Sequence, residues 1–211
     1  MKSKAIYLLG FICLFFFVLS VSIAITISFM PLYVFDIEYL NIANRIEMTK
    51  EILLKNYSIL LNYLTIPWIT ELEMPNFPSS KKGLFHFSEV KKLFLLDYII
   101  LLFSGIGSFL FLSYLKKRSI IWKISRFFRW GSLITPLLII TLFVNFDTLF
   151  VLFHKVSFNN DAWLFNASTD PIILALPEVF FMHSFILAFG LFEVFFIIGY
   201  LISKRAGLQQ K

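Results

Sequence analysis

The stretch AIYLLGFICLFFFVLSVSIAITISFM, residues Ala5 to Met30, contains no charged side chain. Three further runs, residues 93–115, 130–153 and 179–203, are nearly as apolar. Each run is long enough to cross a hydrocarbon core about 30 Å thick as a helix. None shows the alternation of polar and apolar residues that is typical of membrane-barrel strands. We therefore predict an all-α integral membrane protein with four transmembrane helices and a small extracytoplasmic cap.

The composition excludes a water-soluble globular domain. Of 211 residues, 59% are hydrophobic and 15% are charged, whereas about 25% of the residues of soluble domains are charged. The 28 phenylalanines exceed what a soluble core of this size can bury, so lipid is expected to cover much of this surface. The single cysteine, Cys13, excludes a disulfide framework and a thiolate metal cluster. No basic module interleaved with aromatic residues indicates nucleic-acid binding, and none is expected.

The distribution of basic residues predicts the orientation. The N-terminal tip, the connection at 116–129 and the tail at 204–211 carry Lys and Arg but no acid. Because cytoplasmic loops are enriched in Lys and Arg, both termini and the 116–129 loop are expected in the cytoplasm. The expected segments are a transmembrane helix within 1–30, an extracytoplasmic cap at 31–92, transmembrane helices at 93–115, 130–153 and 179–203, and a second extracytoplasmic segment at 154–178.

Two helices are expected in the cap. Thr49 precedes KEILLKNYSILLNYL, in which apolar residues recur at helical spacing, and its hydroxyl can cap that helix. Three prolines then break the chain before the next regular segment. Ser80 can cap a second helix, KKGLFHFSEVKKLF at 81–94, which we expect to run directly into the second span.

Histidines stand at two of the predicted extracytoplasmic boundaries. His86 has Glu89 three residues later, and residues at this spacing share a helix face. His154 follows Asp147 by seven residues and Phe150 by four, again on one stripe of a helix. A carboxylate beside an imidazole can orient the ring and raise its basicity. A single histidine at an interface is often an anchor, but two at one depth indicate a site.

The connection FHKVSFNNDAWLF, residues 153–165, adds polar and aromatic side chains at the same boundary. Asn160 can donate to a carbonyl, and Trp163 can form an apolar wall. Asp170 and Glu178 either line the site or fill capping positions at helix starts. Lys91 either binds a phosphate headgroup or is a surface charge. His183, inside the last span, is either a third polar member of the site or a packed side chain.

The segments HFSEVKKLF, FDTLFVLFHKVSFNNDAW and TDPIILALPE resemble the bacterial lipoprotein intramolecular transacylase family. The sequence departs from that pattern at Glu89, where aspartate is common, and at Ser157, where an aromatic residue is usual. The resemblance implies a four-helix enzyme of the bacterial cell membrane with its site at the extracytoplasmic face. It also implies transfer of the sn-2 acyl chain of a diacylated lipoprotein to the α-amine of the same lipoprotein's N-terminal cysteine, which gives a lyso-form lipoprotein. The catalytic histidines carried over from the family are His86 and His154.

The chemistry of this transfer suits the candidate residues. Aminolysis of an ester needs a base for the amine proton, donors for the oxyanion and a proton for the departing alkoxide, and imidazole can fill these roles. An aromatic pocket formed by Tyr57, Phe150 and Trp163 would grip acyl chains and exclude water. The expected partners are the diacylated lipoprotein and membrane lipid. We expect a monomer with no cofactor and no metal.

Two other classes remain open. A haem or metal protein would use the three histidines as ligands, although no metal-binding spacing of Cys and His occurs in the sequence. A non-catalytic membrane assembly factor would tolerate replacement of both His86 and His154. Mass measurement of a lipoprotein's N-terminal peptide distinguishes these classes from a transferase.

Overall fold

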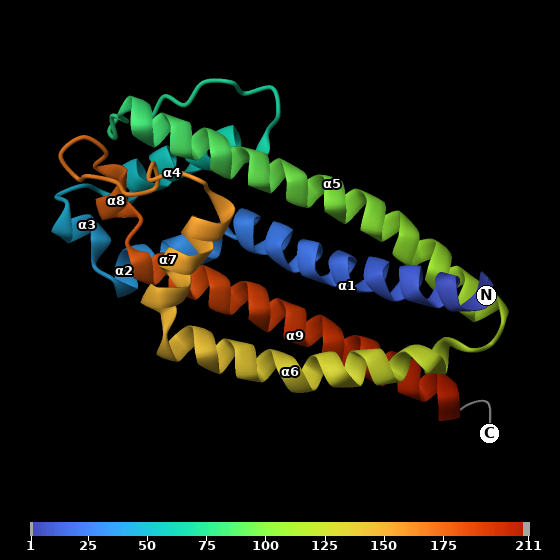
Figure 1. Ribbon diagram of the computed structural model, residues 1–211. Helices are drawn as coiled ribbons and strands as arrows, with labels where there is room; N and C mark the ends of the chain where they lie inside the picture. The colour runs from blue at the N-terminus through green and yellow to red at the C-terminus, as the bar shows by residue number, and fades with distance from the viewer. Residues whose placement is uncertain (1, 209–211) are drawn as a thin grey trace. The chain divides into compact units, whose positions relative to one another are not determined.

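The computed structural model describes residues 2–208, with side chains from Lys4 onward, and its regular elements there are all helices (Figure 1). Two basic positions used to predict the orientation, Lys211 and the side chain of Lys2, lie outside this description. The elements are α1 (Lys2–Ser28), α2 (Met30–Tyr39), α3 (Ile42–Arg45), α4 (Lys50–Thr65), α5 (Lys81–Lys117), the 3₁₀ helix η1 (Ile121–Ile124), α6 (Ser125–Val144), α7 (Phe146–Ser157), α8 (Ile172–Ala175) and α9 (Glu178–Leu208).

Four helical segments are long and apolar enough to cross a membrane. They comprise Lys4–Ser28, Lys81–Lys117, Ile121–Val144 and Glu178–Leu208. The predicted class, an all-helical protein with four membrane-length helices, is therefore confirmed. The helix expected at 81–94 does continue into the second span, because α5 is one helix of 37 residues.

Helix breaks divide two of the predicted runs. The third run, 130–153, is interrupted at Asn145, whose φ of −139° and ψ of 39° are not helical. Asp147 consequently lies in the first turn of α7, not within a membrane-length helix. The first run ends at Phe29, and α2 follows with Pro31 in its first turn, where a missing N–H breaks no helical hydrogen bond. Hydropathy alone does not detect a break of one residue.

The chain forms two compact units, which we describe separately. The bundle unit comprises, within the described chain, residues 2–26, 97–144 and 186–208. The site unit comprises residues 27–96 and 145–185. Every candidate site residue identified from the sequence falls in the site unit.

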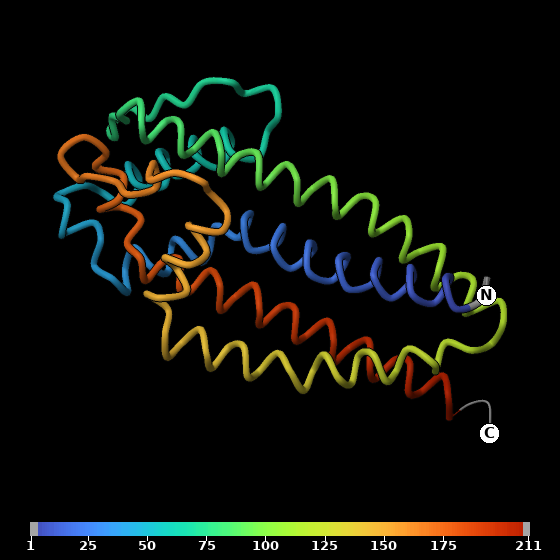
Figure 2. The backbone as a smooth tube through the Cα atoms, in the orientation of Figure 1, coloured from blue at the N-terminus to red at the C-terminus, as the bar shows by residue number. Residues whose placement is uncertain are grey.

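In the bundle unit, α6 and α9 run side by side (Figure 2) and pack through reciprocal pairs of glycine and phenylalanine. A Cβ placed on Gly131 of α6 would lie 1.8 Å from Cε1 of Phe196 on α9. A Cβ placed on Gly199 of α9 would lie 2.5 Å from Cε1 of Phe128 on α6. Each ring thus occupies the space that a side chain on the other helix would need. Small residues that allow such close approach are typical of helix pairs in membranes.

Two acids lie within the bundle unit, and each interacts with a hydroxyl on another helix. Asp97 of α5 accepts a hydrogen bond from Ser20 of α1. The side chain of Glu193 of α9 interacts with the hydroxyl of Thr135 of α6. Because an ionisable group inside a membrane helix needs a polar partner, these contacts indicate that both acids join helices together.

In the site unit, α4 begins as the sequence predicts. The hydroxyl of Thr49 accepts a hydrogen bond from the N–H of Ile52, 3.4 Å away. Asn56 on the buried face of α4 donates to Oδ1 of Asn76 (2.9 Å) and accepts from its backbone N–H (3.2 Å). These bonds attach the proline-containing loop after α4 to the helix, and Phe77 of that loop is buried in the core of the unit.

Candidate active site

His86 of α5 and His154 of α7 lie beside each other in the site unit. Their ring centroids are 5.9 Å apart, and the ring planes are inclined by 34°. The side chains come from segments 68 positions apart in the sequence and are only 7% and 9% exposed. One substrate group placed between the rings could contact both of them.

Aromatic rings surround this pair. Phe158 and Phe165 contact the ring of His86 edge to face, with centroid distances of 4.9 and 5.4 Å. Phe150 and Trp163 contact the ring of His154 at 4.2 and 4.7 Å. The two imidazoles therefore lie in an apolar environment from which water is largely excluded.

The ring of His154 is held in one orientation by its own helix. Its Nδ1 lies 2.7 Å from the carbonyl oxygen of Phe150, one turn earlier. Because a carbonyl can only accept, Nδ1 must carry the hydrogen, and Nε2 of the neutral ring keeps its lone pair. Burial lowers the pKa of His154 below its usual value of 6.5, and the hydrogen bond to Phe150 offsets part of this effect. His154 is therefore neutral at pH 7, with Nε2 available as a base.

Two buried polar atoms beside this histidine have no protein partner. Among the described residues, neither Nδ1 of His86 nor Nε1 of Trp163 makes a hydrogen bond. Buried polar groups in folded proteins are nearly always paired, so unpaired ones call for an explanation. A polar group of a bound substrate would provide the missing partners.

Glu89 does not orient His86 in the way its spacing suggests. Both of its carboxylate oxygens accept hydrogen bonds from Nδ2 of Asn160, at 3.1 and 3.0 Å. The other end of the Asn160 amide, Oδ1, accepts from the backbone N–H of Ala162 at 2.8 Å. Asn160 therefore connects α5 to the loop after α7. This loop carries Phe158 and Trp163, the rings that cover the two histidines.

Asp170 fixes the other end of that loop. Its Oδ1 accepts from the backbone N–H of Ser80, 2.8 Å away, and its Oδ2 accepts from the hydroxyl of Thr169. Ser80 in turn accepts a hydrogen bond from the N–H of Gly83 in the first turn of α5. Asp170 is 3% exposed, and it binds the start of the helix that carries His86. The structure thus favours the capping role over lining of the site.

The remaining predicted site residues contact other groups. Asp147 and Glu178, in the first turns of α7 and α9, share a side-chain hydrogen bond. Lys91 donates to the backbone carbonyls of Ile66 and Ile69, which ties α5 to the loop after α4. The ring of Tyr57 is stacked on Tyr33, with centroids 4.0 Å apart, in the core of the unit. Each of the four side chains thus contacts another part of the site unit, and none of these contacts involves His86 or His154.

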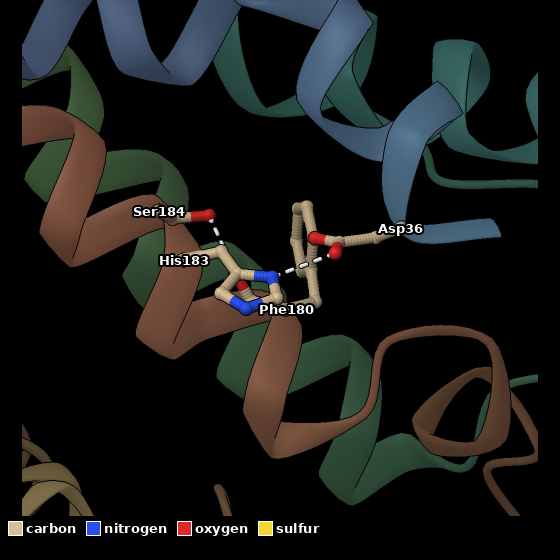
Figure 3. Close-up of polar contacts among 4 residues, drawn as sticks. All are labelled: Asp36, Phe180, His183 and Ser184. Atoms are coloured by element: carbon tan, nitrogen blue, oxygen red, sulfur yellow. Dashed lines mark hydrogen bonds and ion pairs between the residues drawn. The ribbon is translucent and has the colours of Figure 1, made fainter. Parts of the chain in front are cut away.

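A histidine–acid pair lies elsewhere in the site unit (Figure 3). Nδ1 of His183, one turn into α9, lies 2.6 Å from Oδ1 of Asp36 on α2. Asp36 is fully buried, and its Oδ2 has no partner among the described residues. Burial raises the pKa of Asp36, and the hydrogen bond to His183 opposes this rise. Asp36 was not predicted from the sequence as a functional residue; its only signal is an acid placed directly between the apolar residues Phe35 and Ile37.

A cluster that could hold a metal would need several donors in one place. Among the residues that the structure describes, no group of three or more His, Cys, Asp or Glu side chains has such an arrangement. The three histidines are divided between the His86–His154 pair and the contact of His183 with Asp36.

Residues 8–181 match the family model described as lipoprotein intramolecular transacylase Lit. No curated protein matches the sequence. The chain is similar to the in meso structure of the membrane integral lipoprotein intramolecular transacylase Lit from Bacillus cereus, with 30% identity and a TM-score of 0.89 over 99% of this chain and 97% of that chain. Two further structures of that protein, with a histidine-to-arginine and a histidine-to-alanine mutation, are 29% identical and have TM-scores of 0.83 over 99% of this chain and 93% and 95% of theirs. The chain therefore belongs to the lipoprotein intramolecular transacylase family and is a multi-pass membrane acyltransferase that acts on lipoproteins.

Proposed function

We propose that this enzyme moves the sn-2 acyl chain of a diacylglyceryl lipoprotein to the α-amine of that lipoprotein's N-terminal cysteine, with His86 and His154 as its acid–base pair. The observation that carries this proposal is the position of two buried imidazoles 5.9 Å apart within an aromatic enclosure. Amine and ester belong to one molecule, so the enzyme needs no acyl intermediate of its own. Holding the two groups together can contribute about 7–11 kcal/mol to lowering the barrier.

The bonds and protons of the reaction balance without a cofactor. The neutral amine attacks the carbonyl carbon of the sn-2 ester, a C–N bond forms, and the carbonyl oxygen becomes an oxyanion. The C–O bond to the glyceryl group then breaks. One proton leaves the amine and one proton reaches the glyceryl oxygen, which becomes a hydroxyl. The product is an N-acyl, lyso-form lipoprotein of unchanged mass.

His154 is the better base of the pair. Its Nδ1–H is bound to the carbonyl of Phe150, so Nε2 can accept the amine proton and return it to the glyceryl oxygen. The N–H of neutral His86 and the unpaired indole N–H of Trp163 would stabilise the oxyanion. Asn160, for which the sequence suggested this role, already donates to Glu89 and serves as a positioning residue.

The orientation of the chain belongs to the same proposal. The basic segments at 116–129 and 204–208 favour a cytoplasmic position, which puts the segments 31–92 and 154–178 at the extracytoplasmic face. Single cysteines introduced at Lys117 and Lys155 into a Cys13→Ser background test this arrangement. A membrane-impermeant maleimide added to intact cells should label only the variant at Lys155, and labelling of only the variant at Lys117 would reverse the proposed orientation.

The reaction is tested by producing the full chain in bacteria whose lipoproteins are diacylated and carry a free N-terminal amine. Mass spectrometry of a lipoprotein's N-terminal lipopeptide should show an unchanged total mass, with one acyl chain now on the cysteine nitrogen. The amine should also become resistant to amine-reactive reagents. A lipopeptide that loses the mass of one acyl chain and keeps its free amine would identify a hydrolase instead.

The roles of the histidines are tested with His86→Ala and His154→Ala, each of which should abolish the transfer. The matched control is His183→Asn, which replaces the third histidine but keeps an N–H donor for Asp36. This variant should retain the activity. If transfer persists in either Ala variant at a normal protein level, the proposed acid–base pair is refuted.

A further inference from the structure

A cavity of about 530 Å³ lies in the bundle unit, where the start of α6 meets the last turns of α9. None of its lining residues belongs to the site unit or has a place in the proposed reaction. It is lined by Ser125, Arg126, Arg129, Trp130, Tyr200 and Lys204.

Three of the lining side chains are cations without a carboxylate partner. Within the described chain, no ion pair involves Arg126, Arg129 or Lys204. The two acids of the bundle unit are bound to hydroxyls on other helices and so are not counter-charges for this cavity. Because Arg126 and Arg129 are three residues apart on α6, their guanidinium groups lie on one side of the helix. Like charges gathered in this way favour binding of an anion.

The helices that carry these cations are held closely together. Phe128 is in contact with Phe196, with ring centroids 5.5 Å apart, in the layer of glycine–phenylalanine pairs described above. The positive charges on α6 and α9 therefore cannot separate by moving the helices apart. A bound anion would relieve their repulsion.

We propose that this cavity binds the phosphate headgroup of an anionic phospholipid. Arginine matches phosphate geometry with two parallel hydrogen bonds, and lysine and serine can add further donors. Basic pockets between transmembrane helices are suited to such headgroups. Trp130, which is 61% exposed, is of the residue type that prefers the boundary between headgroups and acyl chains.

The surface next to the cavity favours a lipid over a free phosphate ion. Leu133 and Leu137 follow Arg129 at steps of four residues, so the three side chains form one stripe along α6. The two leucines are 54% and 64% exposed. An acyl chain can lie along this apolar stripe while its phosphate contacts the arginines. A zwitterionic lipid would bring its own ammonium group next to the three cations and should bind more weakly.

The proposal is tested on the purified, delipidated full-length protein in detergent. Native mass spectrometry should show retention of one phosphatidylglycerol molecule, and phosphatidylethanolamine should be retained much less. Each removed charge should reduce the affinity for phosphatidylglycerol by about fivefold, so Arg126→Gln/Arg129→Gln/Lys204→Gln should reduce it by about a hundredfold. The control, Lys116→Gln/Lys117→Gln/Arg118→Gln, removes the same charge from the end of α5 and the residue after it, and should leave the affinity unchanged.

Several outcomes would overturn the proposal. Equal losses of phosphatidylglycerol affinity in the cavity variant and in the control variant at the end of α5 would mean that lipid binding depends only on total charge. Equal retention of phosphatidylethanolamine would exclude selection for an anionic headgroup. Competition by inorganic phosphate at the concentration of the lipid would identify the free ion as the ligand. If the triple variant does not fold, the single variant Lys204→Gln provides the same comparison. The readout is lipid retention, so the result is independent of transacylase activity.

Discussion

The hydrogen bonds between Glu89 and Asn160 should control the loop that covers the two histidines. Asn160 donates to both oxygens of the Glu89 carboxylate, and hydrogen bonds to a charged group contribute about 1.5–3 kcal/mol. Replacing either residue with Ala removes the whole interaction. Because 1.4 kcal/mol corresponds to about a tenfold change in an equilibrium constant, opening of the loop at 158–165 should become about 10 to 150 times more frequent. The rings of Phe158 and Trp163 would then cover the histidines less often, and transfer should slow.

A double-mutant cycle separates this role from the ring-orienting role that the sequence suggested. If Glu89 acts through Asn160, then Glu89→Ala/Asn160→Ala should be no more severe than either single variant, which gives a coupling of about 1.5–3 kcal/mol. Asn160→Asp alone would place two carboxylates in contact and should open the loop strongly. Adding Glu89→Gln to that variant restores an amide–carboxylate pair with the donor and acceptor exchanged. This double variant should restore most of the protection of the loop backbone against hydrogen exchange.

Hydrogen exchange of the 158–165 backbone is the direct assay, since the N–H of Ala162 is bound to Asn160 itself. The transfer rate should follow the same order among the variants. Independent effects of the two Ala substitutions, with a coupling below about 0.5 kcal/mol, would refute the interaction as the determinant of loop position. Failure of the exchanged pair to rescue Asn160→Asp would do the same.

Three further predictions concern protonation and packing. Because the chain has only three histidines, NMR titration should resolve His154, and its pKa should lie below 6.5 because burial disfavours the imidazolium. At a pH below about 6.5 the unfolded chain therefore binds more protons than the folded chain. The free energy of unfolding should fall as the pH drops through this range. Gly83→Ala should lower the thermal midpoint, because the new Cβ would lie 2.1 Å from Oδ1 of Asp170, whereas an unhindered Gly→Ala change in a helix stabilises by about 1 kcal/mol. His183→Ala should lower the free energy of unfolding by about 3–5 kcal/mol, because it leaves the buried Asp36 unpaired. Asp36→Asn should lower it less, and thermal unfolding of both variants measures the difference.

The sequence contains enough information to predict the helices that carry the site. The length of the apolar runs predicts the membrane-length helices, and the apolar spacing after Thr49 predicts α4 with its cap. The helical pattern from residue 81 predicts the continuous helix on which His86 lies. These features depend on local sequence, because a helix forms its hydrogen bonds within one segment. The break at Asn145 was not predicted, because a few polar residues within a long apolar run lower its mean hydropathy only a little.

The partners of the polar side chains could not be predicted in the same way. Helical spacing suggests that Glu89 contacts His86, yet Asn160 binds both carboxylate oxygens from a loop 71 residues away. Asp170 binds the start of α5 across 90 residues, and Asp36 contacts His183 across 147. Helical periodicity identifies residues that are neighbours on one helix. The hydrogen-bond donor that a carboxylate contacts can instead come from a segment that is distant in the sequence and close only in the folded chain. Such contacts depend on loop conformation, which residue spacing does not specify.

The unpaired polar atoms of the site bear on how the enzyme distinguishes its substrate from the surrounding phospholipids. An acyl chain gains little by leaving the bilayer for an aromatic wall, because lipid and wall are similarly apolar. Selectivity must therefore come mainly from polar contacts. Leaving Nδ1 of His86 and Nε1 of Trp163 buried without partners costs about 1–3 kcal/mol each, and a ligand that pairs with both recovers this free energy. In the proposed reaction the carbonyl oxygen of the lipoprotein's sn-2 ester accepts from both of these groups, and the α-amine gives its proton to His154. An ordinary diacyl phospholipid has the ester but lacks an α-amine at the required position, so it would bind without reacting.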